Sequence, residues 1–392
     1  MLMPLKAVIR EEDIERIRRV VIALTSSPMP SVVSRVNHQS GSCPMSSEDW
    51  ILAADIAAAE SLITWFAHRL AGPEVNCAPE AQAYAAALVA PAQVWTGLAA
   101  TLSADLIRTM TAQGIPARII KGQLLAQAVY GDHMLRNSSD IDLVVPHQYL
   151  ARTAEHLQRQ GFDPRLSMEW FRDERFAHLN REASFSDGGG AFTVDLHWRL
   201  ANRWNVRVVA EGELFEDQGY ALELRGRTLP WFGAALLFRI QLAHVVSSDF
   251  LGLKAWIDLA HTSDLLSPED WASCSSRCAA LGSGRALALA LLVLESVFRR
   301  SLPIPISRKE RVLLSPTAER ISAWLWTGRT PSFFANGVRT ASVTGGAPMV
   351  WRALSQLWNP AMIDFENADA TVSTATLTWA MVKRRTLKRL RA

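Results

Sequence analysis

Two aspartates inside an apolar, strand-like run constrain this chain more than any other feature of its sequence. Asp140 and Asp142 lie in DIDLVV, whose other residues are the Ile, Leu and Val typical of buried strands. Residues two apart on a strand project to the same side, so the two carboxylates are expected to lie together. Neighbouring anions repel each other unless a cation lies between them, and carboxylate oxygens suit Mg²⁺. Solvated acids on an edge strand are the alternative, which the apolar neighbours disfavour.

A third carboxylate has the same setting in a later strand. Asp195 lies in FTVDLHW, an otherwise apolar run that follows the hairpin-type glycine loop at residues 188–190. Three carboxylates on two adjacent strands could hold two metal ions, which can clamp the attacking and leaving oxygens of a phosphoryl transfer. Pairing of Asp195 with Arg199 is the alternative. His197 shares its face of the strand and could orient a ligand or act as a hydrogen-bonded structural histidine.

A glycine turn precedes the first two aspartates. Gly122 lies between the short strand ARII and a helix that begins near Gln123. Glycine lets the backbone approach a ligand closely, and a helix N-terminus offers free N–H groups to an anion. A phosphate bound there would lie next to metal ions on the neighbouring strand. Lys121 and Arg136 could add positive charge, although Lys121 could also cover apolar surface and Arg136 could pair with Asp132.

The order of elements along the chain indicates an α/β or α+β core, and we expect the α+β class. Three helices are expected first, the last interrupted at Pro91, at residues 10–25, 49–70 and 80–113. Short strands and helices alternate from Gly114, with strands at residues 117–120, 140–145, 176–187 and 191–200. Helical periodicity returns after Trp231. We therefore expect a small mixed-sheet core at 96–228, with N-terminal helices at 1–95 and a C-terminal helical domain at 229–392.

The composition excludes several classes of protein. Hydrophobic residues make up 49% and charged residues 20% of the 392, as in folded, soluble proteins. The net charge of +3 is mildly basic, and a nucleic-acid partner is not expected. The basic cluster at residues 383–391 reads as a solvated helix end, with a patch for RNA or anionic lipid as the alternative. The four scattered cysteines indicate reduced, buried thiols. Without an apolar leader or an apolar run of ~20 residues, we expect a cytoplasmic protein with no membrane span.

Polar residues on the later helices leave several roles open. His244 and Asp258 are expected to make a contact between helices, with a place in an acceptor cleft as the alternative. Lys254 is expected to be solvated, with a phosphate contact as the alternative. The 14 tryptophans are expected to pack in cores and interfaces rather than to stack on bases, because none alternates with basic residues.

Together these motifs resemble the active-site pattern of the polymerase-β-like nucleotidyltransferase superfamily. The shared order is a strand, a glycine, a helix, a D-x-D strand, a further helix and a strand with a third aspartate. KGQLLAQAVYGDHMLRNSSDIDLVV and VDLHWRL resemble, more narrowly, the group called uncharacterised nucleotidyltransferases. So does the later segment that contains His244, Lys254, Trp256 and Asp258. The resemblance spans about residues 50–300.

The resemblance implies a metal-dependent nucleotidyltransferase. Its catalytic metal ligands would be Asp140, Asp142 and Asp195. Nucleotide binding would fall to the glycine turn and the residues around it: Lys121, Gly122, Gln123, Arg136 and Ser139. Two Mg²⁺ ions are expected, with Mn²⁺ as the alternative, and ATP is the first candidate among the nucleoside triphosphates.

The implied reaction joins a nucleoside monophosphate to a hydroxyl on a small molecule, peptide or protein and releases pyrophosphate. Some members of the group are associated with the tailoring of ribosomal peptide natural products, so modification of a peptide is one option. The superfamily usually has Gly-Gly or Gly-Ser in the phosphate loop, whereas Gln123 follows Gly122 here. The alternative is therefore a catalytically weak, nucleotide-binding regulatory or toxin–antitoxin-type protein.

Overall fold

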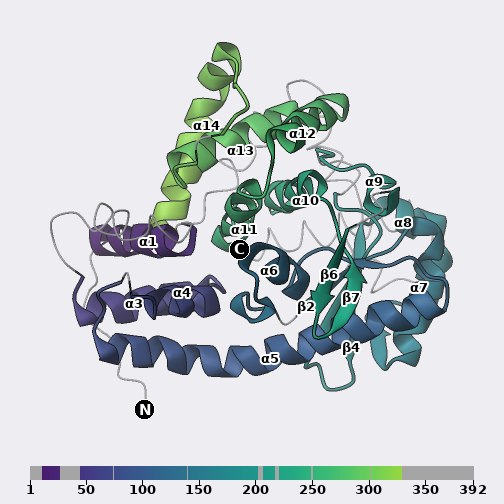
Figure 1. The fold of residues 1–392 in the computed structure, drawn as a ribbon. Helices are drawn as coiled ribbons and strands as arrows, with labels where there is room; N and C mark the ends of the chain where they lie inside the picture. Colours follow the sequence, from purple (N-terminus) through teal and green to yellow (C-terminus); the bar gives the residue numbers. More distant parts are fainter. Residues whose placement is uncertain are drawn as a thin grey trace, which may run out of the picture.

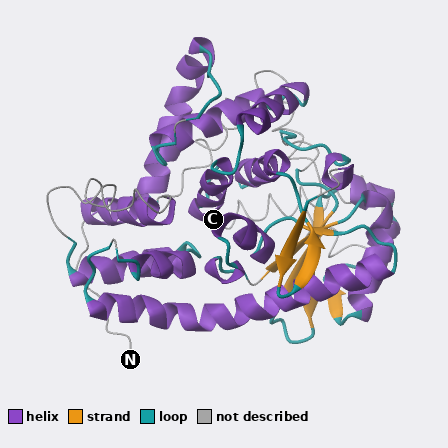
Figure 2. Ribbon diagram, viewed as in Figure 1, coloured by secondary structure: helices purple, strands orange, loops and turns teal. Residues whose placement is uncertain are grey.

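Helices precede and follow a small mixed sheet along the chain (Figures 1 and 2). The computed structural model describes residues 11–26, 45–73, 75–138, 140–201, 206–216, 220–248, 250–300 and 302–328. Ser139 and the basic cluster at 383–391 lie outside the described residues. The mixture of helices and a mixed sheet confirms the predicted α+β class.

The described part of the N-terminal region contains four helices. They are α1 (Glu11–Ser26), α3 (Ser47–Ala59), α4 (Ile63–Leu70) and α5 (Pro79–Ala112). Helix α3 begins with a capping box, in which the side chains of Ser46 and Asp49 each accept from the backbone N–H of the other residue. Figure 1 shows α5 running beneath both α3–α4 and the sheet, and it contacts both. This helix therefore connects the N-terminal helices to the core.

The predicted break at Pro91 is wrong, because α5 continues through that residue for 34 residues in all. A proline inside a helix removes one backbone hydrogen bond and crowds the preceding turn. Here the helix is held on both sides of the proline, by buried residues such as Ala85 before it and Ala100 after it. The expected boundary between residues 95 and 96 falls inside this continuous helix.

Helix α5 is also the one described helix that is long and apolar enough, by length and composition, to cross a membrane. A single helix of this kind is weak evidence for a span, since long helices of soluble proteins have the same composition. In this fold α5 packs against α3, α4 and strands of the core.

The core is a five-stranded sheet in the order β1-β2-β5-β4-β3. Its strands are β1 (Arg118–Ile119), β2 (Asp140–Val144), β3 (Phe162–Pro164), β4 (Glu182–Asp187) and β5 (Thr193–His197). Strands β2 and β5 are parallel, and the other three pairings are antiparallel. The predicted glycine hairpin is confirmed as the connection between β4 and β5. The central pair, β2 and β5, carries all three predicted aspartates.

Short helices lie between these strands and after the last of them. They are α6 (Gln123–Tyr130), α7 (Leu150–Arg159), α8 (Glu174–Leu179) and α9 (Glu213–Glu216), with 3₁₀ turns at His133–Leu135, His147–Tyr149 and Met168–Arg172. The strand predicted from residue 176 is partly wrong, because its first residues belong to α8. Asp173 caps that helix by accepting from the backbone N–H of Arg175, which favours the helix over a strand. A separate hairpin, β6 (Ala221–Leu224) and β7 (Arg227–Pro230), follows the core.

The described part of the C-terminal region, up to residue 328, is helical, as predicted. It contains α10 (Ala234–Ser247), α11 (Leu253–Ser263), α12 (Pro268–Ala280), α13 (Gly284–Ser296) and α14 (Arg308–Thr327). Cys274 and Cys278 are buried free thiols in α12, in agreement with the reading of the cysteines. Helix α1 packs against both α11 and α14, so the two ends of the described chain meet.

The C-terminal end of α1 is capped by side chains from three other elements. The backbone oxygen of Thr25 accepts from the indole N–H of Trp65 (2.7 Å) and is 2.6 Å from Nε2 of His261. The backbone oxygen of Ser26 accepts from Arg300 (2.6 Å). The last carbonyls of a helix have no partner within the helix, and these contacts supply partners. Because a carbonyl can only accept, Nε2 of His261 carries a proton.

His261 is expected to make the stability of the protein depend on pH. Burial lowers the pKa of His261 to about 4, although its bond to Thr25 acts in the opposite direction. The unfolded chain binds the proton more tightly, at the ordinary pKa of about 6.5. The free energy of unfolding is therefore expected to fall as pH drops from about 6.5 towards 4, by up to about 1.4 kcal/mol per pH unit for this group.

Urea unfolding at pH 7, 6 and 5 of the wild type and of His261→Gln checks this expectation. Glutamine keeps an N–H donor but cannot take up a proton in this pH range. The difference in stability between the two proteins should shrink as pH falls. If the free energies of unfolding of the two proteins change with pH in parallel, His261 is not the titrating group.

Candidate functional site

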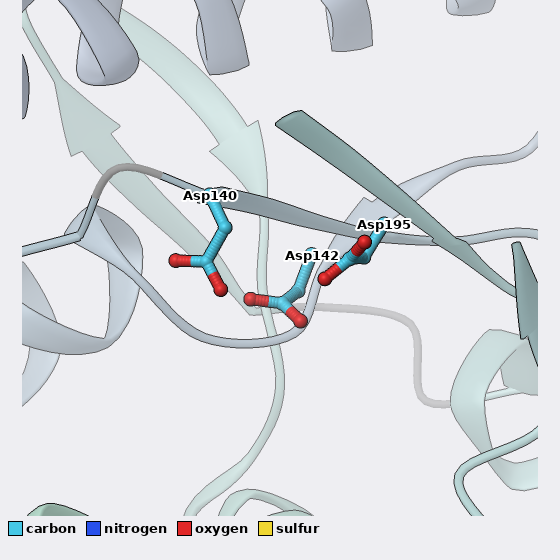
Figure 3. A group of neighbouring side chains, drawn as sticks. All are labelled: Asp140, Asp142 and Asp195. Atoms are coloured by element: carbon cyan, nitrogen blue, oxygen red, sulfur yellow. The ribbon is translucent and has the colours of Figure 1, made fainter. Parts of the chain in front are cut away.

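Three carboxylates meet on the two central strands. The parallel register places Asp142 on β2 directly beside Asp195 on β5, and Asp140 lies two residues earlier on β2. One oxygen from each of the three side chains lies within 4.8 Å of the others. Figure 3 shows all three carboxylates on the same side of the strands. The period-two geometry of a strand, together with this register, brings the aspartates together as the sequence predicted.

Each carboxylate is oriented by neighbours. Asp140 accepts from the hydroxyl of Ser138 (2.9 Å), and Asp195 accepts from the hydroxyl of Ser184 (2.6 Å). Asp142 is 2% exposed, and its Oδ1 lies 2.9 Å from Nζ of Lys121. Its other oxygen, Oδ2, is buried and makes no hydrogen bond within the described part of the chain.

His197 connects the aspartates to a further acid. Its Nε2 lies 3.1 Å from Oδ1 of Asp142, and its Nδ1 lies 3.1 Å from Oε2 of Glu182 on β4. Burial opposes a charge on this ring, but the two carboxylates outweigh burial and raise the pKa of His197 to about 9. The imidazolium in turn helps to lower the pKa of Glu182 to about 2, against the effect of burial. His197 therefore orients Asp142, whereas no sequence pattern indicated the part played by Glu182.

The electrostatics distinguish the members of the cluster. Burial disfavours the charged form of Asp142, but Lys121 and His197 outweigh it and hold the pKa of this carboxyl below its usual range. Burial raises the pKa of Asp195, and the charge of Asp142 adds to that effect, while the bond from Ser184 lowers it. Asp195 therefore accepts a proton more readily than Asp142 does.

The cluster fits a divalent metal ion. Its donors are carboxylate oxygens, the ligands that Mg²⁺ and similar hard cations prefer. The buried Oδ2 of Asp142 is an acceptor without a donor among the described residues, which is costly unless a ligand completes it. Lys121 and His197 both approach Oδ1 and leave Oδ2 to such a ligand. Asp140, Asp142 and Asp195 could therefore hold the ion together.

The glycine turn lies beside the segment that leads into β2. Gly122 is the residue before α6 and has φ +71° and ψ −136°, a conformation that side chains disfavour. A Cβ atom there would lie 3.6 Å from the hydroxyl of Ser138. Gln123 is 1% exposed and donates from Nε2 to the backbone oxygen of Ser138 (3.1 Å). Its side chain braces the segment before the aspartates, a role that the sequence did not indicate.

Arg136 is not placed at the carboxylates. Its guanidinium forms three hydrogen bonds of 2.9–3.2 Å to the carboxylate of Asp258 on α11, and both side chains are buried. The expected partner, Asp132, instead accepts from the backbone N–H of Met134. The expected contact between Asp258 and His244 is replaced by this ion pair, because a guanidinium offers a carboxylate two parallel donors. The pair joins the segment before β2 to the C-terminal helices.

Two cavities border the carboxylates. The inner cavity, of about 200 Å³, is lined by β-strand residues and by α10, among them Lys121, Asp142, Asp195, His197, Gln241 and His244. The outer cavity, of about 670 Å³, is lined by residues of α5, of the segment before β2, of strands β2, β4 and β5, and of α11, among them Trp95, Asn137, Ser138, Asp140, Asp195 and Lys254. Asp195 lines both cavities, so they meet at the cluster.

Lys254 differs from the solvated side chain that was expected. It is partly buried in the wall of the outer cavity and donates to the backbone oxygen of Asn137 (2.5 Å). Burial lowers the pKa of Lys254 to about 7, with Arg136 acting in the same direction. A buried lysine beside two carboxylates is a candidate for contact with an anion, a feature that only the folded chain reveals.

Comparison with known proteins agrees with this geometry. A family model described as "Uncharacterised nucleotidyltransferase" matches residues 46–299, which include the sheet, the three aspartates and helices α3 to α13. Neither a curated protein nor a solved structure matches the chain. The match supports nucleotidyl transfer, with a nucleoside triphosphate as donor, as the general activity. The chain belongs to the uncharacterised nucleotidyltransferase family.

Proposed function

We propose that this protein is an Mg²⁺-dependent enzyme that transfers a nucleoside monophosphate from a nucleoside triphosphate to a hydroxyl group. The new bond joins the acceptor oxygen to the α-phosphorus, the bond from that phosphorus to pyrophosphate breaks, and the hydroxyl proton is released. The observation that carries the proposal is the cluster of three carboxylates within 4.8 Å, with a buried oxygen of Asp142 left for a ligand. A bound divalent cation would neutralise charge on the triphosphate.

The outer cavity is the proposed site of the nucleotide. Its volume of about 670 Å³ is within the range of ~300–1,000 Å³ found for small-molecule sites. Lys254 offers a positive charge to the phosphates, and Ser138 offers a hydroxyl beside the Gly122 turn. The side chain of Gln123 is buried against Ser138, so its bulk is directed into the fold.

Asp195 is the proposed acceptor of the hydroxyl proton. It borders both cavities, and burial together with the charge of Asp142 raises its pKa. A base is effective when its pKa approaches the working pH, and the shift is in that direction. Asp142 stays ionised and buried, and Lys121 and His197 hold it in place.

Release of pyrophosphate tests the proposed reaction. The protein is incubated with Mg²⁺, each of the four common nucleoside triphosphates and a panel of hydroxyl-bearing compounds, peptides and proteins. We expect Mg²⁺-dependent release of pyrophosphate, with intact mass identifying the species that gains a nucleoside monophosphate. Nucleotide binding without release under all of these conditions would contradict the proposal and favour a regulatory, nucleotide-binding protein.

Lys254→Met is expected to weaken binding of the triphosphate by about 10- to 100-fold. The lost contact is a hydrogen bond to a charged group, which contributes about 1.5–3 kcal/mol. Removing a partly buried ammonium should leave the fold intact. Isothermal titration with a non-hydrolysable triphosphate analogue measures the effect, and Lys309→Met, an exposed lysine of α14, is the matched control. Equal affinities in the two variants would remove Lys254 from the nucleotide site.

A further inference from the structure

Helix α10 carries a polar stripe on an otherwise apolar helix. Gln241, His244 and Ser247 are three residues apart, and Ser248 follows the end of the helix. Residues at this spacing lie on one face of a helix. All four line the inner cavity, opposite the carboxylates. Apart from Arg239, which pairs with Glu213, the polar residues of this helix therefore line the cavity beside the cluster.

Gln241 is the least satisfied of these residues. It is 1% exposed, and neither Oε1 nor Nε2 makes a hydrogen bond within the described part of the chain. Gln123 is equally buried but does have a partner, the backbone oxygen of Ser138. A buried amide without partners is rare and destabilises the folded state. Such a group in the wall of a cavity indicates a ligand that supplies both a donor and an acceptor.

Apart from Asp195, which the proposed function assigns to the metal ion and the hydroxyl proton, the charged groups of the inner cavity are already paired. Lys121 and His197 contact Asp142, and Arg181 and His197 contact Glu182. The groups that remain are neutral: the amide of Gln241, the serine hydroxyls and His244, whose pKa burial lowers to about 4. An anionic ligand would find no unpaired cation among these residues, and a cationic ligand would compete with the metal ion for Asp195. The volume of about 200 Å³ is also below that of typical small-molecule sites.

We infer that the inner cavity is the acceptor site of the transfer reaction, that it takes a small, uncharged group bearing a hydroxyl, and that Gln241 recognises this group through hydrogen bonds. The inference rests on the proposed function, because it names the second substrate of that reaction. Asp195 lines both cavities, so a hydroxyl in the inner cavity and a phosphate in the outer cavity meet at that carboxylate.

Stability of the substrate-free protein gives the first test. Gln241→Met keeps the shape of the side chain and removes an amide without partners, so we expect the melting temperature to rise by about 1–4 °C. Gln123→Met is the matched control, since it removes an equally buried amide that does have a partner, and it should lower the melting temperature. If Gln241→Met lowers the melting temperature as much as Gln123→Met does, Gln241 is a structural residue and the inference is overturned.

Choice of acceptor gives the second test, with matched pairs of probes. Glycerol is compared with glycerol 3-phosphate, and the N-acetylated amide of serine with free serine, each with labelled triphosphates and Mg²⁺. We expect the uncharged member of each pair to be preferred. Gln241→Met should raise the acceptor KM by about 10-fold or more while the affinity for the triphosphate is unchanged.

The two proposals fail in different ways. Transfer by the wild type to charged probes alone, or an unchanged acceptor KM in Gln241→Met, overturns the acceptor site and leaves nucleotidyl transfer standing. Absence of transfer with every triphosphate and acceptor contradicts the proposed function instead. The melting temperatures of the two glutamine variants then still decide whether Gln241 is a ligand-binding or a structural residue.

Discussion

Asp142→Asn is expected to reduce pyrophosphate release by about 10³-fold or more while the protein stays folded. Asparagine has nearly the same shape but no charge, so the carboxylate cluster loses the member that is most deeply buried. The oxygen that has no partner among the described residues, Oδ2, belongs to this side chain. A weaker cluster would hold a divalent cation poorly and neutralise less charge on the triphosphate.

The fold should survive this change. His197 keeps its contact with Glu182 and can release its proton when the charge of Asp142 is removed. Lys121 keeps some access to solvent, with 18% of its side chain exposed, so its ammonium can be hydrated. Neither neighbour is left as a fully buried cation without a partner.

Asp163→Asn provides the control for Asp142→Asn. Asp163 lies on β3 of the same sheet, and its side chain is exposed. Pyrophosphate release and circular dichroism are measured for both variants, and for the wild type after removal of divalent ions with a chelator. The chelated wild type should be as inactive as Asp142→Asn. Turnover in Asp142→Asn within a few-fold of that in Asp163→Asn would exclude Asp142 from catalysis.

Local pattern was sufficient to predict the centre of the site. The alternation in DIDLVV fixes which side chains share a face, and the glycine loop before FTVDLHW predicts a returning strand. Two strands that each carry acids in an apolar run are both expected in the interior of the sheet, where they can be neighbours. The shared face of Asp140 and Asp142 follows from a short-range signal, whereas the pairing of β2 with β5 that brings Asp195 to them is a long-range contact, which the structure shows directly.

The surroundings of the cluster depend on contacts that are distant in sequence. Arg136 and Asp258 are 122 residues apart, and no local spacing relates them. Lys254 has the sequence context of a surface lysine, yet the packing of α11 on the segment before β2 places it in a cavity wall. The continuity of α5 through Pro91 likewise depends on tertiary packing, which overrides local propensity.

Asp258→Asn is expected to destabilise the protein by about 3–5 kcal/mol, since it leaves a buried guanidinium without its counter-ion. Arg136 cannot lose its proton in response, because the guanidinium stays charged at any ordinary pH. Its Nη1 already lacks a hydrogen-bond partner within the described residues, so no second acceptor is in reach to compensate. Urea unfolding of the variant and of the wild type measures the loss.

An exposed ion pair on the core supplies the control. Glu155 and Arg172 contact each other on the surface, where both side chains are well hydrated. Glu155→Gln should change stability by less than about 1 kcal/mol, as exposed pairs usually do. If Asp258→Asn lowers the free energy of unfolding no more than Glu155→Gln does, Arg136 and Asp258 do not form a buried ion pair.

The double variant Arg136→Met/Asp258→Leu separates structure from nucleotide binding. Apolar side chains of similar volume can replace a buried ion pair at little loss of stability, so the double variant should be far more stable than Asp258→Asn. Asp258 lies one helical turn after Lys254, and both residues bond to the segment before β2. If the pair acts by holding α11 against that segment, affinity for the triphosphate should fall in Asp258→Asn and recover in the double variant. A stable double variant that still binds the triphosphate weakly would instead place Arg136 in contact with the nucleotide. In that variant the fold is no longer destabilised by an unpaired charge, so the weak binding would come from loss of a direct contact.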